Sequence, residues 1–181
     1  RGGYLMETKF GLNTSVSAAA DIWDAGGTYT GQPVSFTPET VDIFSSDSAD
    51  YASGTGAQTV RIYGLKTSTS TAYEYEDITL HASDGTNAVT SVNTWWRVPR
   101  VQVLTAGSGG GNAGTITVRS TTTTANVFAT VRPGYNQTNV AAWTVPYGQK
   151  AYLKRVLVTC ARANAASGTA TITLRCRVQG G

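Results

Sequence analysis

The sequence has little charge, a single histidine and no long apolar run, and each shortage excludes a class of protein. Charged residues make up 14% of the 181 residues, well below the usual quarter. No apolar stretch approaches the roughly 20 residues that a membrane helix needs, so we expect no membrane partner. Apolar residues do not recur at helical spacing over more than about one turn, which argues against a helical protein.

Residues suited to catalysis are also scarce. His81 is the only histidine, and neither a serine nor a cysteine stands at a recognisable spacing from it. The acidic clusters Asp47/Asp50 and 74–77 lack the spacing of a calcium loop. The glycine-rich stretch 107–114 lacks the Lys-Ser/Thr of a phosphate loop, and we expect it to be a mobile hairpin tip. The sequence therefore predicts no enzyme, with no catalytic residue, no metal site and no cofactor.

Charge is unevenly distributed along the chain. All 11 acidic residues lie at or before Asp84, whereas six of the 14 basic residues lie at or after Lys150. This polarity suits assembly with an oppositely charged neighbour. The net charge of +3 and the lack of a dense basic stripe argue against a nucleic-acid partner.

Most of the chain consists of short alternating segments separated by Gly, Pro, Asn and Ser, the pattern of β-strands and turns. In residues 59–63, for example, Val60 and Ile62 share one face and Arg61 and Tyr63 share the other. Strands are predicted at 40–44, 59–63, 73–81, 89–92, 95–98, 101–104, 115–119, 126–131, 140–145, 152–162 and 169–178. About ten short antiparallel strands predict an all-β, jelly-roll-like sandwich or barrel.

Two regions differ in regularity. Residues 1–36 are broken up by glycines, and we expect an extended N-terminal arm with little regular structure that gains order against a partner. Residues 37–181 form the predicted β-domain. The candidate interface residues are aromatic side chains of the arm and a Trp-Trp-Arg run: Tyr4, Phe10, Trp23, Trp95, Trp96 and Arg97. Because neighbouring residues of a strand point to opposite faces, one tryptophan belongs to the core, and the other to packing, an interface or a sugar-binding platform.

The two cysteines lie in the last two predicted strands. If 156–160 and 170–176 fold as a hairpin about Gly168, Cys160 and Cys176 face each other directly. Opposed residues at a non-hydrogen-bonded position have Cα atoms about 4.5 Å apart, at the lower end of disulfide reach. The alternative is a pair of reduced thiols packed as small apolar groups.

Several segments resemble, as a set and in order, a family of structural virion proteins of tailed bacteriophages from marine and freshwater sources, of the cyanophage type. The main segment is Ser45-Ser46-Asp47-Ser48 with Asp50, followed by Gly54-Thr55-Gly56-Ala57 and Val60-Arg61-Ile62-Tyr63-Gly64-Leu65. Further matching segments are 94–103, 106–108 with 112–117, 133–138 and 143–153. One departure is Lys66-Thr67-Ser68, where the family usually has an acidic residue.

The resemblance implies a capsid decoration, or cement, protein. Such a protein is a compact homotrimer that binds the major capsid protein on the outer surface of the phage head, after assembly in the host cytoplasm. A tail or fibre component, or an ornament that binds host carbohydrate, is the alternative that the resemblance leaves open.

Overall fold

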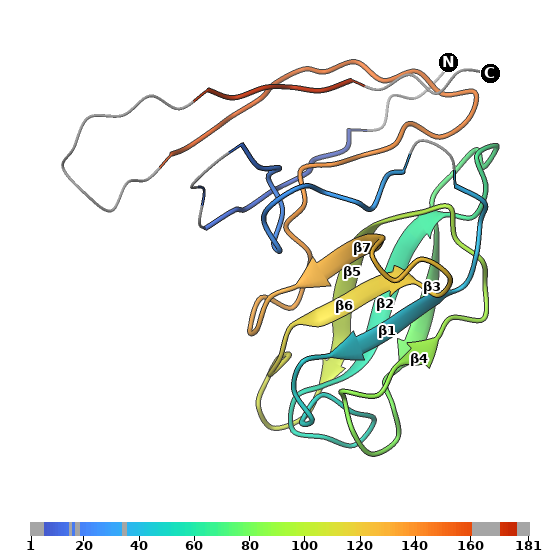
Figure 1. Cartoon of the computed structure of the whole chain (residues 1–181), viewed down its shortest axis with the longest axis vertical. Coiled ribbons are helices and arrows are strands. Elements are labelled where there is room, and N and C mark those ends of the chain that lie inside the picture. The colour runs from blue at the N-terminus through green and yellow to red at the C-terminus, as the bar shows by residue number, and fades with distance from the viewer. Residues whose placement is uncertain (1–5, 15, 17–18, 34–35, 161–170, 177–181) are drawn as a thin grey trace. The chain divides into compact units, whose positions relative to one another are not determined.

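The computed structural model describes residues 6–14, 16, 19–33, 36–160 and 171–176. The chain divides into two units, residues 1–149 and 150–181. All seven strands of the described residues belong to the first unit, and none of these residues is helical (Figure 1). The described residues accordingly contain no helix long and apolar enough to cross a membrane.

The strands form two antiparallel sheets that face each other as a β-sandwich (Figure 1). The four-stranded sheet has the order β4-β1-β6-β7. Its strands are β4 (Val89–Thr90), β1 (Val41–Ser45), β6 (Ile116–Ser120) and β7 (Val127–Val131). The three-stranded sheet has the order β3-β2-β5, with β3 (Glu74–Thr79), β2 (Ala57–Leu65) and β5 (Arg97–Ala106).

The core fills the space between the sheets with the apolar half of each alternating strand. Val41 and Ile43 of β1 and Ile116 and Val118 of β6 are fully buried, as the period of two requires. The opposing sheet contributes a second apolar row, which is Val60, Ile62, Ile78, Val98 and Val101. The predicted all-β sandwich of antiparallel strands is therefore confirmed.

The number of strands differs from the prediction of about ten. The predicted strands 95–98 and 101–104 are one continuous strand, β5, that runs through Pro99. The β2–β5 pairing changes register between Tyr63 and Leu65, opposite this proline, and such an irregularity accommodates a residue that lacks an N–H. The described residues of 140–145, 152–162 and 169–178 contain no strand, because alternation alone does not supply a hydrogen-bonding partner.

The described residues at the N-terminal end carry no regular strand, yet several of them pack on the sandwich. Trp23 is buried, and the Tyr29 hydroxyl donates a hydrogen bond of 2.7 Å to the Phe128 carbonyl. Thr30 Oγ1 accepts from the Val127 N–H at 3.0 Å. These contacts lie along β7 and cover that edge of the sheet.

The second unit is described at residues 150–160 and 171–176, all of which are exposed. Cys160 and Cys176 are free thiols and are both exposed, so the predicted burial and the predicted disulfide are both absent from the structure. Residues 161–170, which hold the predicted turn about Gly168, lie outside the described residues.

Candidate functional site

Three of the segments quoted above for the resemblance, 45–50, 54–57 and 112–117, meet at one end of the sandwich around the carboxylate of Asp50. Asp50 is fully buried although it lies in a turn between β1 and β2. Its Oδ1 accepts hydrogen bonds from the N–H groups of Ala57 at 2.6 Å and Ala113 at 2.8 Å. Its Oδ2 accepts from Ser45 Oγ at 2.6 Å and from the Gly114 N–H at 2.8 Å.

This carboxylate holds the two sheets together at that end. Ser45 ends β1 of one sheet, Ala57 begins β2 of the other, and Ala113 and Gly114 belong to the loop between β5 and β6. Four donors satisfy the acceptor capacity of a buried anion. This position of the Asp50 carboxylate also requires a glycine at position 56, since a Cβ there would overlap Asp50 Oδ1.

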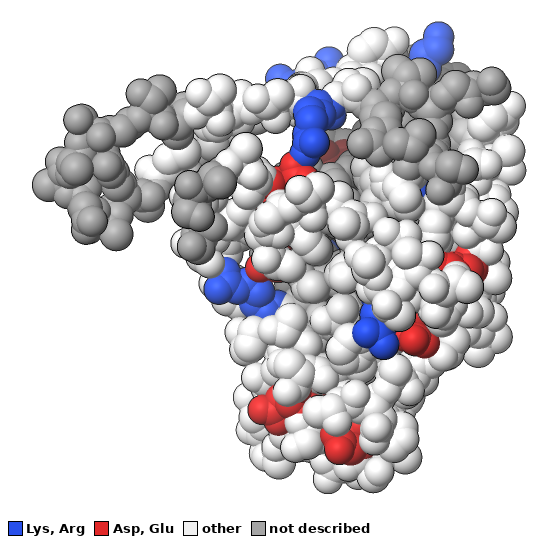
Figure 2. Space-filling view, in the orientation of Figure 1, with Lys and Arg blue, Asp and Glu red and all other residues white. Residues whose placement is uncertain are grey.

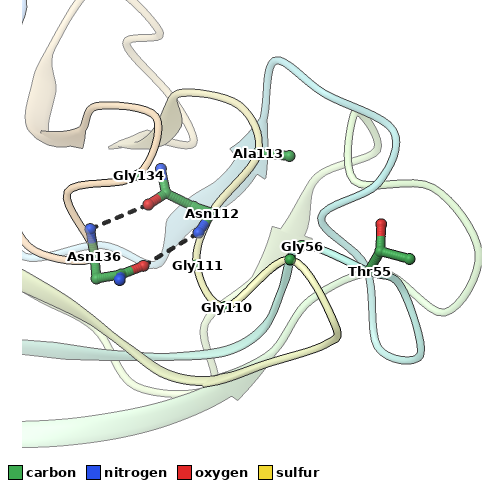
Figure 3. Close-up of a pocket in the computed structure, with 9 residues that line it drawn as sticks. Thr55, Gly56, Gly110, Gly111, Asn112, Ala113, Gly134 and Asn136 are labelled. Atoms are coloured by element: carbon green, nitrogen blue, oxygen red, sulfur yellow. Dashed lines mark hydrogen bonds between the residues drawn. The ribbon is translucent and has the colours of Figure 1, made fainter.

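A second buried polar group lies beside the first. Asn112 and Asn136 exchange two hydrogen bonds, because the N–H of each donates to Oδ1 of the other at 3.1 Å (Figure 3). The Asn112 amide group also donates to the carbonyls of Gly114 at 2.6 Å and Arg132 at 2.8 Å. Asn136 has a φ of 58°, a left-handed conformation that asparagine tolerates better than most residues. The loop 107–114, predicted to be a mobile tip, is thus fastened to the sandwich.

A shallow depression of about 220 Å³ opens beside these two asparagines (Figure 3). It is lined mainly by glycines, together with Thr55, Ala113 and the asparagines. No charged side chain lines it, and the asparagine amides are already bonded to the main chain. The depression can therefore receive a small neutral group or a loop of a partner, but it supplies no acid, base or nucleophile.

The remaining candidates for chemistry do not form a catalytic arrangement in the described part of the chain. His81 Nδ1 accepts a long hydrogen bond of 3.4 Å from the Ser83 N–H. No group of three or more His, Cys, Asp or Glu side chains that could hold a metal occurs among the described residues. The Asp50 carboxylate takes four donors from the protein itself, so it is a structural anion.

The outer face of the three-stranded sheet carries a cluster of aromatic and charged side chains. Arg61 donates to both Asp77 oxygens, at 2.5 and 2.7 Å, and these hydrogen bonds hold the pKa of the Asp77 carboxyl below its usual value. The Arg61 guanidinium also lies 4.1 Å from the ring centre of Tyr75, and Arg100 lies 5.1 Å from that of Tyr63. We call Arg61, Tyr63, Tyr75, Asp77 and Arg100 the outer cluster. Tyr75 is 58% exposed.

The face of the molecule seen in Figure 2 is mostly uncharged. In Figure 2 the Lys, Arg, Asp and Glu side chains stand as separate spots on a largely white face, which follows from the 14% charge content. A face of this kind loses little hydration free energy when another protein covers it.

The residues predicted as interface contacts are placed differently from one another. Phe10 is 70% exposed, whereas Trp23, Trp95, Trp96 and Arg97 are buried in this chain. Both tryptophans of the pair are enclosed, because Trp95 lies in the core while Arg97 stacks 4.0 Å from the Trp96 ring. Tyr4 lies outside the described residues. Burial gives the interface role of the four enclosed residues no support, and that role stays a prediction.

The outer cluster was not predicted from the sequence, although Arg61 and Tyr63 were expected to share one face of their strand. What was missing is the cross-strand register, which sets Tyr63 opposite Tyr75 and Arg61 opposite Asp77. The signal available in the sequence was alternation in both strands, Arg61 with Tyr63 and Tyr75 with Asp77.

Comparison with known proteins gives no match: no family model, no curated protein and no solved structure is significantly similar to this chain.

Proposed function

We propose that this chain is a structural virion protein of a tailed phage, a capsid decoration protein that binds the outer surface of the head. The observation that carries the proposal is the structural role of the residues on which the resemblance rests. Asp50, Gly56 and Asn112 serve the packing of one end of the sandwich, and none of them forms part of a reactive centre. Residues that stabilise the fold, and take no part in catalysis, are what a protein with a mechanical role requires.

The proposed contact with the major capsid protein is the outer cluster. It lies on a sheet face and contains two tyrosines and two arginines, and tyrosine and arginine are enriched among the residues that supply most binding energy in interfaces. Several copies of such a face, carried by a homotrimer, would attach multivalently and resist the pressure of packaged DNA. The two-sheet β-fold is compatible with the jelly roll proposed for this chain. The proposal involves no nucleic acid, no membrane and no catalysis.

The decisive experiment is to locate the protein in purified particles. Quantitative mass spectrometry against the major capsid protein, combined with electron microscopy of the virion, gives its copy number and position. Hundreds of copies on the shell support the decoration role, whereas single digits to tens would overturn it in favour of a tail or fibre component.

A second measurement tests the proposed surface. Tyr63→Ala and Arg100→Glu should each weaken binding to expanded heads by about tenfold or more, because truncating an interface anchor costs about 2 kcal/mol. Thr117→Ala, on an outward-facing position of β6 in the other sheet, is the matched control. Equal binding by all three variants would exclude the outer cluster as the contact.

The outer cluster also favours one alternative, an ornament that binds host carbohydrate. Exposed tyrosine rings beside bidentate charged groups are suited to stacking against a sugar and bonding its hydroxyls. Saturable binding of the purified protein to host glycans, lost in Tyr75→Ala, would support this alternative.

A further inference from the structure

The C-terminal unit carries strand-forming segments that have no strand partner. Residues 150–160 and 171–176 contain no strand and are exposed throughout. Even the apolar side chains of Leu157 and Leu174 are 77% and 68% exposed. Residues 171–176 alternate apolar residues with Thr or Arg, as a half-buried strand does. Residues 152–158 contain the aromatic and β-branched residues Tyr152, Val156 and Val158, which favour strands. An exposed strand of this kind gains free energy by adding to an open sheet edge.

The sandwich has one long edge that the described chain leaves open. The β7 edge is covered by Tyr29 and Thr30. The β5 edge is covered by residues 136–138, which exchange main-chain hydrogen bonds with Val101 and Val103. The β4 strand has two residues. The fourth edge, β3, pairs only with β2 among the described strands.

The charges of the two units are opposite. Residues 150–181 hold six basic and no acidic residues, a net +6, and residues 1–149 hold eight basic and 11 acidic residues, a net −3. Two C-terminal units would repel each other, which disfavours their stacking together. Pairing with an acidic sandwich edge is favoured instead, and β3 carries Glu74, Glu76 and Asp77.

We propose that residues 152–157 of one copy add, as a parallel strand, to the free edge of β3 in a second copy of this chain. This deepens the homotrimer part of the proposed function and rests on it in that respect. In the parallel register Lys154 lies beside Glu76, Arg155 beside Asp77 and Val156 beside the core residue Ile78. An antiparallel register that pairs Lys154 with Asp77 and Arg155 with Glu76 would instead set Leu157 beside Glu74.

The acceptor carboxylates have room for these cations. Glu76 accepts three hydrogen bonds, from the N–H groups of Val92 and Asn93 and from Asn93 Nδ2. Asp77 accepts two from Arg61. A carboxylate has about four acceptor sites, so each retains capacity for one further donor.

Three variants test the proposal by light scattering on the full chain after size-exclusion chromatography. The wild-type chain should be oligomeric. Arg155→Glu should weaken its association by about tenfold or more, since it sets a like charge against Asp77. Asp77→Arg should do the same from the acceptor side. Lys150→Glu makes the same charge change outside the paired register and should leave association nearly unchanged.

Mixing the variants separates strand donation from general charge effects. The Arg155→Glu chain keeps an intact acceptor edge and the Asp77→Arg chain keeps an intact donor strand, so an equimolar mixture should associate more strongly than either variant does alone. A monomeric wild-type chain, association unaffected by Arg155→Glu, or a mixture that stays monomeric would each overturn the proposal.

Hydrogen exchange provides a readout that does not depend on variants. Amide protection of residues 74–79 and 152–157 should rise together as the wild-type concentration is raised. Protection that is independent of concentration would instead indicate docking within one chain and overturn the exchange between copies. These results concern the purified protein, so they are independent of its copy number in particles.

Discussion

Replacing Asp50 by Asn tests whether the buried carboxylate holds the two sheets together. The amide is the same size but has one acceptor oxygen. Kept toward Ala57 and Ala113, that oxygen leaves the NH₂ facing Ser45 Oγ, which can accept, and the Gly114 N–H, which cannot. A buried donor without a partner costs about 1–3 kcal/mol, and the remaining hydrogen bonds lose their charge assistance. We expect the free energy of unfolding to fall by about 3 kcal/mol, a large part of the 5–15 kcal/mol of a typical domain.

The assay is urea unfolding followed by tryptophan fluorescence. With an m-value of about 2 kcal/mol/M, a loss of about 3 kcal/mol moves the midpoint down by about 1.5 M. The matched control is Asp42→Asn, because Asp42 accepts one hydrogen bond, at 2.8 Å, from the exposed Thr90. That change should cost no more than about 0.5 kcal/mol. If Asp50→Asn costs as little as the control, the carboxylate does not hold the sheets and the reasoning fails.

Three further predictions concern stability. Gly64→Ala should destabilise the chain by about 1–3 kcal/mol, because the added Cβ would overlap the Arg97 carbonyl; an unchanged melting temperature would contradict this. Burial raises the pKa of Tyr73 to about 12. The unfolded chain then loses this proton near pH 10 while the folded chain keeps it, so stability should be level below pH 10 and fall above it by up to about 1.4 kcal/mol per pH unit. A fall no steeper in wild type than in Tyr73→Phe would refute the assignment. Asn136→Gly should cost less than Asn136→Ala, since both lose the hydrogen bond from the Asn112 N–H to Asn136 Oδ1 but only alanine is strained at a φ of 58°; the reverse order in chemical denaturation would exclude strain.

The sequence by itself determined the class of fold. Alternation at a period of two, with β-branched residues and turn signals, leaves few other ways to bury the apolar side chains of residues 41–45, 57–65 and 116–120. It also located the segments that surround Asp50, although not their purpose. Local pattern suffices here because the face that a side chain takes depends only on its neighbours along the strand.

Tertiary structure alone decided the rest, because it depends on which distant segments become neighbours. The Asp50 carboxylate has donors seven and more than sixty residues away, a meeting that no local pattern encodes. Trp95 and Trp96 are both buried. The rule that neighbouring residues take opposite faces does not apply to them, because the β5 strand begins only after them, at Arg97. The same reason accounts for the C-terminal segments. Their β-branched and apolar residues predict strands, but a strand exists only where another edge accepts its hydrogen bonds. In one copy of the described chain residues 152–160 and 171–176 have no such edge.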